Sequence, residues 1–206
     1  RDAYIMRVGT RFHEFAERFF NYCDVIDIDD WEIMIPVQFS PSEVKMAQWF
    51  VAMERRRYKQ YNDEGRIDEW RPIAREIQIK YNVLSICGTI DRVDWYNRNN
   101  GEVAIIEYKT GFSFYKPTLL RQLAFYTILW EQAFNMGKVV KLIVINPRLQ
   151  KIEEYDVTPR IVNSILKKLI KLRNMIRADD NWPRKCWIKK FIMCRLCTVD
   201  ESGLYK

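Results

Sequence analysis

Hydrophobic residues recur along this chain with two different periods, and the two periods separate predicted helices from predicted strands. Apolar residues three or four positions apart indicate amphipathic helices, whereas short continuous or alternating apolar runs between polar turns indicate strands. The helical pattern covers residues 10–22, 40–61 and 117–135 and begins again at Thr158-Pro159. The strand pattern covers residues 31–37, 75–80, 83–95, 102–108, 139–146 and 151–157.

Short-range signals define several of these boundaries. Ser40 is a good N-cap, Pro41 suits the first helical turn, and Glu43 completes a capping box. The polar turn at residues 97–101 joins two strand patterns into an antiparallel hairpin. The order of helices and strands predicts a mixed α/β domain around one central sheet. We expect one domain over residues 1–206, with a helical N-terminal part (about 1–70) and a C-terminal helix and tail (about 158–206).

The predicted hairpin carries charged side chains where buried strands usually carry only apolar ones. The run from Val103 to Ile106 is a buried-strand pattern with Glu107 and Lys109 at its end, and Asp91 lies on the other arm. Burying such groups is costly unless a metal, a phosphate or another charge satisfies them. Two converging carboxylates suit Mg²⁺ or Mn²⁺, and Lys109 points to the same strand face as Glu107. These are the parts of a phosphodiester hydrolase, although a surface Glu107–Lys109 pair would give the same spacing.

Charge and composition favour a polyanionic partner. The 206 residues carry a net charge of +7, and the basic residues form clusters interleaved with aromatic ones. Nucleic acid is the commonest partner for such a surface, although each cluster by itself could be a solvated helix face. No apolar run approaches the roughly 20 residues that span a bilayer, and no signal peptide is visible, so we expect no membrane association.

Five short motifs resemble, in order, those of a known enzyme family. The stretch from Gly88 to Asp94, followed by Ile106-Glu107-Tyr108-Lys109, is similar to the core of the PD-(D/E)XK nuclease superfamily. The closer resemblance is to its RecB-like branch, which includes the exonuclease domains of recombination helicases and the CRISPR-adaptation nucleases. The supporting positions are the motif from Gly9 to His13 in the first predicted helix, Glu76 before the hairpin, and the pair Gln122 and Tyr126 in a later helix.

The resemblance implies a restriction-endonuclease-like α/β fold, with a central mixed sheet flanked by helices, and a Mg²⁺- or Mn²⁺-dependent deoxyribonuclease. Asp91 and Glu107 would bind the metal, assisted by the backbone carbonyl of Tyr108. His13 would complete the metal site from the first helix, although a lone histidine on a partly apolar helix would otherwise be assigned to the core. Lys109 would position the attacking water.

Other positions keep two interpretations open. Gln122 and Tyr126 are four residues apart and share a helix face, so they would contact the catalytic lysine, a substrate phosphate or a base, unless they pack in the core. Glu76 is either an accessory metal ligand or a strand acid paired with an arginine. Asp94 has an odd offset from Asp91, so we expect it to have a structural role.

The cysteines depart from the pattern of the branch. Some of its members hold an iron–sulfur cluster on four cysteines, one N-terminal and three C-terminal. Here Cys23 follows the histidine motif instead of preceding it, and the spacing of Cys186, Cys194 and Cys197 differs from the family's close-paired run. We therefore expect buried or disulfide-linked cysteines rather than an iron–sulfur or zinc site. The odd, dispersed set of five favours a reducing, intracellular and thus cytoplasmic setting.

The leading hypothesis is a metal-dependent DNA nuclease in replication, repair, recombination or mobile-genome processing, acting on single-stranded DNA, duplex ends or branched DNA. The alternative is a nucleic-acid-binding protein that uses the nuclease scaffold without turnover. A structural protein with an accidental acid–lysine motif is a third hypothesis. The sequence leaves open endonuclease or exonuclease action, strand polarity, and whether the protein is a monomer or a homodimer.

Overall fold

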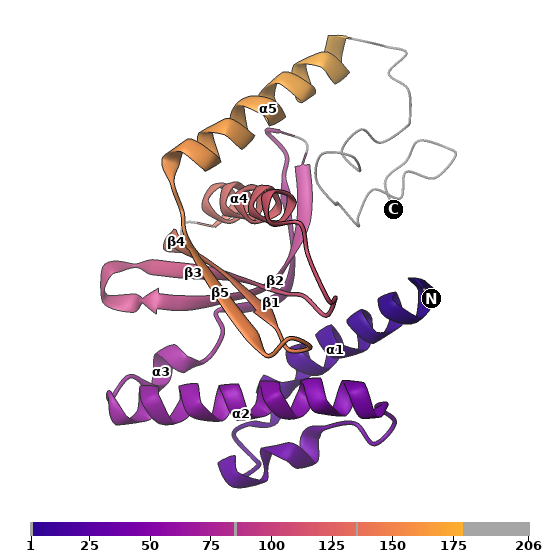
Figure 1. Ribbon diagram of the computed structural model, residues 1–206. Coiled ribbons are helices and arrows are strands. Elements are labelled where there is room, and N and C mark those ends of the chain that lie inside the picture. The colour runs from indigo at the N-terminus through magenta and orange to yellow at the C-terminus, as the bar shows by residue number, and fades with distance from the viewer. Residues whose placement is uncertain (1, 85, 135, 179–206) are drawn as a thin grey trace.

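The computed structural model describes residues 2–84, 86–134 and 136–178, and it has strands at its centre with helices on both sides (Figure 1). The strands are β1 (Ala74–Tyr81), β2 (Ile86–Asn97), β3 (Glu102–Tyr108), β4 (Lys138–Asn146) and β5 (Lys151–Asp156). The α-helices are α1 (Asp2–Tyr22), α2 (Pro41–Asp63), α3 (Ile67–Trp70), α4 (Lys116–Ala133) and α5 (Pro159–Ala178), and the 3-10 helices are η1 (Ile28–Met34) and η2 (Arg98–Asn100).

Within the described residues the strands form one sheet in the order β1-β2-β3-β4-β5. Neighbouring strands are antiparallel except β3 and β4, which run parallel because α4 crosses over between them. Figure 1 shows α4 and α5 on one face of the sheet and α1 and α2 on the other. This arrangement confirms the predicted mixed sheet flanked by helices. No helix in the described part of the chain is long and apolar enough to cross a membrane.

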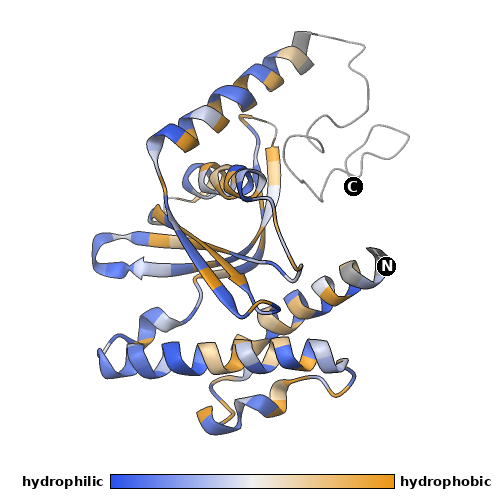
Figure 2. Ribbon diagram, viewed as in Figure 1, coloured by the Kyte–Doolittle hydropathy of each residue, from blue (hydrophilic) through white to orange (hydrophobic). Residues whose placement is uncertain are grey.

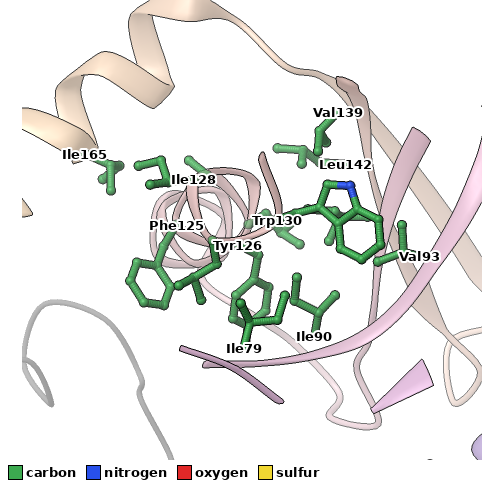
Figure 3. Close-up of a cluster of buried hydrophobic side chains, with 14 of the residues drawn as sticks. Ile79, Ile90, Val93, Phe125, Tyr126, Ile128, Trp130, Val139, Leu142 and Ile165 are labelled. Atoms are coloured by element: carbon green, nitrogen blue, oxygen red, sulfur yellow. The ribbon is translucent and has the colours of Figure 1, made fainter. Parts of the chain in front are cut away.

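Alternate residues of β3 contribute to two separate cores, which explains the unbroken apolar run of this strand. Val103 and Ile105 belong to the cluster under α4, which includes Phe125 and Trp130 (Figure 3). Ile106 belongs to the cluster formed with α1 and α2 on the other face. The last helix, α5, alternates hydrophilic and hydrophobic positions and packs on α4 (Figure 2). A strand that is buried on both faces can carry charged side chains without a large penalty only near its end.

The predicted strand at residues 31–37 is wrong, because residues 28–34 form η1 instead. The Asp27 side chain caps this short helix by accepting a hydrogen bond from the Asp29 backbone N–H at 2.9 Å. Trp31 is buried and stacks on Trp70 with ring centroids 5.4 Å apart, whereas Ile33 is exposed. The alternation of apolar and polar residues in this segment therefore results from one buried tryptophan and not from a strand with one face on a sheet.

Other predicted boundaries need smaller corrections. Helix α1 begins at Asp2 and not near residue 10, and the short helix α3 had no clear signal in the sequence. Strand β2 begins at Ile86 rather than residue 83, because residues 82–84 form a turn after β1. The capping box at the start of α2 is confirmed, since the Ser40 backbone N–H donates to the Glu43 carboxylate at 2.8 Å. The hairpin of β2 and β3 is also confirmed, and Gly101 closes its turn with φ at +64°.

A network of charged side chains is buried between α2 and the sheet. Arg92, which is fully buried, donates to Glu54 at 2.6 Å and to Asp94 at 2.6 and 2.7 Å. Arg57 donates to the same two carboxylates at 2.8 and 2.7 Å, and the Tyr108 hydroxyl accepts from Arg92 at 3.3 Å. Burial opposes ionisation of Asp94, but Arg92 and Arg57 outweigh it and lower the pKa of Asp94. Asp94 therefore has the structural role expected from its offset.

We expect Arg92→Met to lower the free energy of unfolding by about 3–5 kcal/mol, because it leaves the Glu54 and Asp94 carboxylates buried without their main counter-charge. Urea unfolding followed by circular dichroism measures the loss. Arg56→Met is the matched control, since Arg56 is exposed on α2, the helix that carries Glu54. A loss below about 1 kcal/mol for Arg92→Met, close to that of an ordinary surface substitution, would contradict the proposed importance of the network.

Candidate active site

The two predicted catalytic acids occupy facing positions at one end of the β2–β3 hairpin. Arg92 pairs with Ile106, so the next residues toward this end are Asp91 on β2 and Glu107 on β3. Both are buried, with 8% of Asp91 and 4% of Glu107 exposed. The Tyr108 backbone N–H donates to Asp91 Oδ2 at 2.8 Å and fixes the orientation of that carboxylate. The pairing of the strands thus brings the two acids of the sequence motif together.

A third acid extends this pair into a row across three strands. Arg75 pairs with Arg92 and Ile77 pairs with Ile90, so Glu76 lies level with Asp91. Glu76 has φ at +43°, which few residues other than glycine adopt and which costs of the order of 1–3 kcal/mol. Strained backbone of this kind is often found at functional sites, where the surrounding structure holds it in place.

Helix α1 places His13 between two of these acids. His13 Nδ1 lies 3.1 Å from Glu76 Oε1 and 3.4 Å from Asp91 Oδ1, so Glu76 meets the histidine and not an arginine. The preceding residue, Phe12, anchors the helix by packing edge-on against the Tyr108 ring at 5.8 Å between centroids. Burial opposes protonation of His13, but Asp91 and Glu76 outweigh it and raise its pKa to about 10. The imidazole must lose this proton before it can bind a metal.

Glu107 is held between a lysine and an amide. Its Oε1 accepts hydrogen bonds from Lys109 Nζ at 2.5 Å and from Gln122 Nε2 at 2.9 Å. Burial and the nearby Asp91 carboxylate raise the pKa of Glu107 to about 7, against the opposing effect of Lys109. Its other oxygen, Oε2, is buried and has no hydrogen-bond partner among the described residues. A buried carboxylate oxygen without a partner is costly unless a cation satisfies it.

The donor atoms of this cluster fit a divalent cation. One ligand atom each from His13, Glu76 and Asp91 lie within 4.8 Å of one another, and Glu107, whose Oε2 has no partner among the described residues, stands in the same row of acids. Carboxylate oxygens are the preferred ligands of Mg²⁺ and Mn²⁺, and imidazole is a common further ligand for transition metals. For the Tyr108 backbone carbonyl, the metal role implied by the motif remains a prediction.

Helix α4 supplies the predicted glutamine and tyrosine to the same cluster. Gln122 Nε2 donates to the Tyr126 hydroxyl at 2.9 Å as well as to Glu107, and Lys109 Nζ donates to Gln122 Oε1 at 3.4 Å. This close approach of α4 depends on Gly88 in β2, where a Cβ atom would come within 2.8 Å of a Leu129 methyl carbon. Both Gln122 and Tyr126 therefore contact the site and are not simply core residues.

These side chains line one cavity of about 560 Å³. Sequence reasoning missed the outer part of its lining, which comes from the start of α1, from the loop before α4 and from the first turn of α4. The one available signal was the cluster of aromatic residues directly after the lysine motif, at residues 112–115. The residues missed include Met6, Phe114, Tyr115 and Thr118.

Of the four cysteines considered as cluster ligands, the structure describes only Cys23. Cys23 is a free thiol that donates to the Phe19 carbonyl at 3.1 Å, and burial raises its pKa to about 12. The raised pKa favours the protonated thiol over the thiolate, which is the form that binds metals. Cys186, Cys194 and Cys197 lie outside the described residues, so the expectation about a cluster at these four positions remains untested.

Comparison with known families agrees with the geometry. The model of the PD-(D/E)XK nuclease superfamily matches residues 2–202, which is nearly the whole chain, and the chain belongs to this superfamily. The mixed sheet with flanking helices is accordingly a restriction-endonuclease-like fold, and membership implies a nuclease that acts on nucleic acid. Nucleases of this superfamily use divalent metals, and the cluster of His13, Glu76 and Asp91 could hold one. No curated protein matches the chain.

We expect Gly88→Val to lower the free energy of unfolding by about 1–3 kcal/mol, because the new side chain would collide with Leu129, Phe125 and Tyr126 on α4. Valine favours strands, so the loss measures the collision and not strand propensity. Gly111→Ala is the control, since its Cβ meets nothing closer than 3.4 Å. Urea midpoints for both variants test the close approach, and equal midpoints would contradict it.

Proposed function

We propose that this chain is a Mg²⁺- or Mn²⁺-dependent deoxyribonuclease. The observation that carries the proposal is the row of Glu76, Asp91 and Glu107 across three strands, with Lys109 on the last acid and His13 on the other two. Burying such a cluster of charges costs free energy, and neutral side chains at the same positions would stabilise the fold better. A buried charged cluster therefore indicates a functional role. DNA is the substrate that the resemblance to the RecB-like branch implies.

In this proposal the ligands are the residues that the geometry gathers. Asp91 and Glu107 would hold the cation together with the Tyr108 carbonyl, and His13 and Glu76 would complete the site. When bound, a divalent cation polarises the phosphate and makes a water molecule more acidic. The neutral form of His13 would be the ligand, so its proton would leave as the cation binds.

The remaining polar side chains would orient the reacting groups. Lys109 Nζ, 2.5 Å from Glu107 Oε1, would hold the attacking water and stabilise negative charge on the phosphate. The Gln122 amide donates to Glu107 and Tyr126 and accepts from Lys109 at 3.4 Å, so it would limit the rotation of the lysine. A lysine held in one orientation contributes more to catalysis than a freely rotating one.

Two features of the described residues support the RecB-like branch within the superfamily. One is His13 on the first helix beside Asp91, and the other is the Gln122–Tyr126 pair that contacts the site from α4. By this resemblance the protein would act in DNA replication, repair, recombination or mobile-genome processing, and its dispersed cysteines favour a cytoplasmic setting. A homodimer would suit branched or palindromic substrates, and a monomer would suit the processing of ends.

The alternative is a nucleic-acid-binding protein on the nuclease scaffold. A binding-only derivative has no need of the buried acid row or of the lysine on Glu107, and their presence here favours turnover. Binding without cleavage of any substrate would favour the alternative.

Glu107→Gln and Lys109→Ala should each reduce DNA cleavage by about 10²–10⁴-fold while DNA binding survives, because each removes a group that acts on the reacting atoms. Cleavage of single-stranded, duplex, flapped and branched DNA with Mn²⁺, Mg²⁺ or EDTA provides the measurement. Chelation should abolish cleavage by the wild-type protein.

Matched controls come from the opposite ends of β3 and its neighbour β4. Glu102→Gln lies at the start of β3 and Lys138→Ala at the start of β4, so both change the same charges away from the site. These variants should cleave like the wild-type protein. If Glu107→Gln and Lys109→Ala both retain wild-type cleavage rates, the assignment of the site is wrong.

The metal site can be tested without turnover. Mn²⁺ at about 100 times its Kd should stabilise the wild-type protein by about 2.7 kcal/mol and raise its Tm. Asp91→Asn and Glu76→Gln should each lose most of this shift, whereas Glu102→Gln should keep it. If Glu76→Gln alone keeps the full Tm shift, Glu76 is not a metal ligand and only orients His13. If Asp91→Asn keeps the full Tm shift, the cation binds at another site.

A further inference from the structure

The loop between β3 and α4, together with the first turns of α4, combines aromatic side chains with an excess of positive charge. Residues 108–130 contain no aspartate or glutamate, although they include Lys109, Lys116 and Arg121. Two aromatic side chains in this loop are exposed at the mouth of the cavity: 72% of Phe112 and 71% of Tyr115 is accessible to solvent. Tyr115 and the neighbours of Phe112 line the cavity itself. The loop starts directly after the lysine of the proposed site.

This loop is held in place by the turn between β4 and β5. Asn146, which is buried, donates from Nδ2 to the Gly111 carbonyl at 2.9 Å. Arg148 donates from Nε to the Thr110 carbonyl at 2.5 Å. The guanidinium carbon of the same arginine lies 4.7 Å from the centroid of the Phe112 ring, within the range of a cation–π contact. The hydrogen bonds to the loop backbone and the Arg148 contact therefore hold the exposed Phe112 ring in position.

An exposed ring that is fixed in place suits a ligand that presents a flat apolar face. Single exposed hydrophobic residues are common, but here two rings lie within four residues, beside a nuclease cavity. Nearby cations would attract a polyanion: Arg148 lies 4.7 Å from the centroid of the Phe112 ring, and Lys116 directly follows Tyr115 in the chain. Bases of single-stranded nucleic acid have free faces for stacking, whereas those of a duplex are covered by their neighbours. An acidic protein partner would have no comparable use for the rings.

We propose that Phe112 and Tyr115 stack against unpaired bases of a single strand whose backbone passes into the catalytic cavity. This inference rests on the proposed nuclease function and adds the substrate class, a single-stranded segment at the site of cleavage. Arg148 acts as a positioning residue, because it fixes the loop through Thr110 and supports the Phe112 ring. Rigid placement lowers the entropy that binding would otherwise cost.

The test compares binding to normal and abasic strands in EDTA, where no cleavage interferes. Fluorescence anisotropy gives the affinity of a labelled single-stranded DNA, of the same strand with abasic sites, of RNA of the same sequence, and of a blunt duplex. Phe112→Ala and Tyr115→Ala should each weaken binding to the normal strand about tenfold, the typical effect of removing one stacking ring. Neither variant should weaken binding to the abasic strand or to the duplex.

Two further variants separate stacking from other effects. Phe112→Trp should restore the affinity, because indole stacks at least as well as phenyl. Tyr96→Ala is the matched control, because Tyr96 is also exposed and also lies near a cation, Lys141, at 5.6 Å. Tyr96 lies near the end of β2 that is away from the cavity. This variant should bind every ligand as the wild-type protein does. The same losses on RNA would support stacking of single strands in general.

Wild-type affinity of both loop variants for the normal strand would overturn the proposal, and so would equal losses on normal and abasic strands. A loss of duplex binding as large as the loss of single-strand binding would overturn it too. Failure of the proposed nuclease function would look different, as the absence of any cleavage by the wild-type protein with Mn²⁺. The binding comparison in EDTA does not depend on that result.

Discussion

The alternation of side chains along β2 and β3 is the constraint on which the rest of the structure depends. Successive residues of a strand point to opposite faces of the sheet, so neighbouring residues in the sequence contact different parts of the structure. Asp91 and Glu107 line the cavity, whereas Arg92 and Tyr108 meet in the ion network beneath α2. Two adjacent strands therefore carry the acids of the proposed site on one side and contact the N-terminal helices on the other. A shift of register by one residue would exchange the two roles and destroy both.

Electrostatic balance explains why so many charges can gather at one end of the sheet. Three acids in a row repel one another, and burial strengthens the repulsion. His13 and Lys109 offset part of it, but burial and the nearby Asp91 carboxylate still raise the pKa of Glu107. A site that is under-neutralised in this way favours a bound cation, which is the property expected of a metal-dependent nuclease.

The loop before α4 and the turn after β4 extend this site outward. Strand β3 ends in the acid–lysine motif and leads directly into the aromatic loop, while the parallel neighbour β4 ends in Asn146, which holds that loop. The parallel pairing of β3 and β4 thus places the acid–lysine motif and the exposed aromatic rings at the same edge of the sheet. Because open α/β sheets usually bind ligands at the ends of their strands, this edge is a natural position for a nuclease site.

The sequence by itself determined the local features. The apolar run before Glu107, the capping box at Ser40 and the turn at Gly101 follow from backbone preferences and side-chain period, and the order of the motifs indicated the acids and the nuclease family. Only the tertiary structure decided which partners meet. Glu76 could have paired with an arginine, and it joins His13 because β1 pairs with β2 in one register. The segment around Trp31 alternates like a strand but packs as a 3-10 helix on another tryptophan, and the support of the aromatic loop comes from a distant turn. Such contacts depend on packing between segments far apart in the chain, which local spacing does not encode.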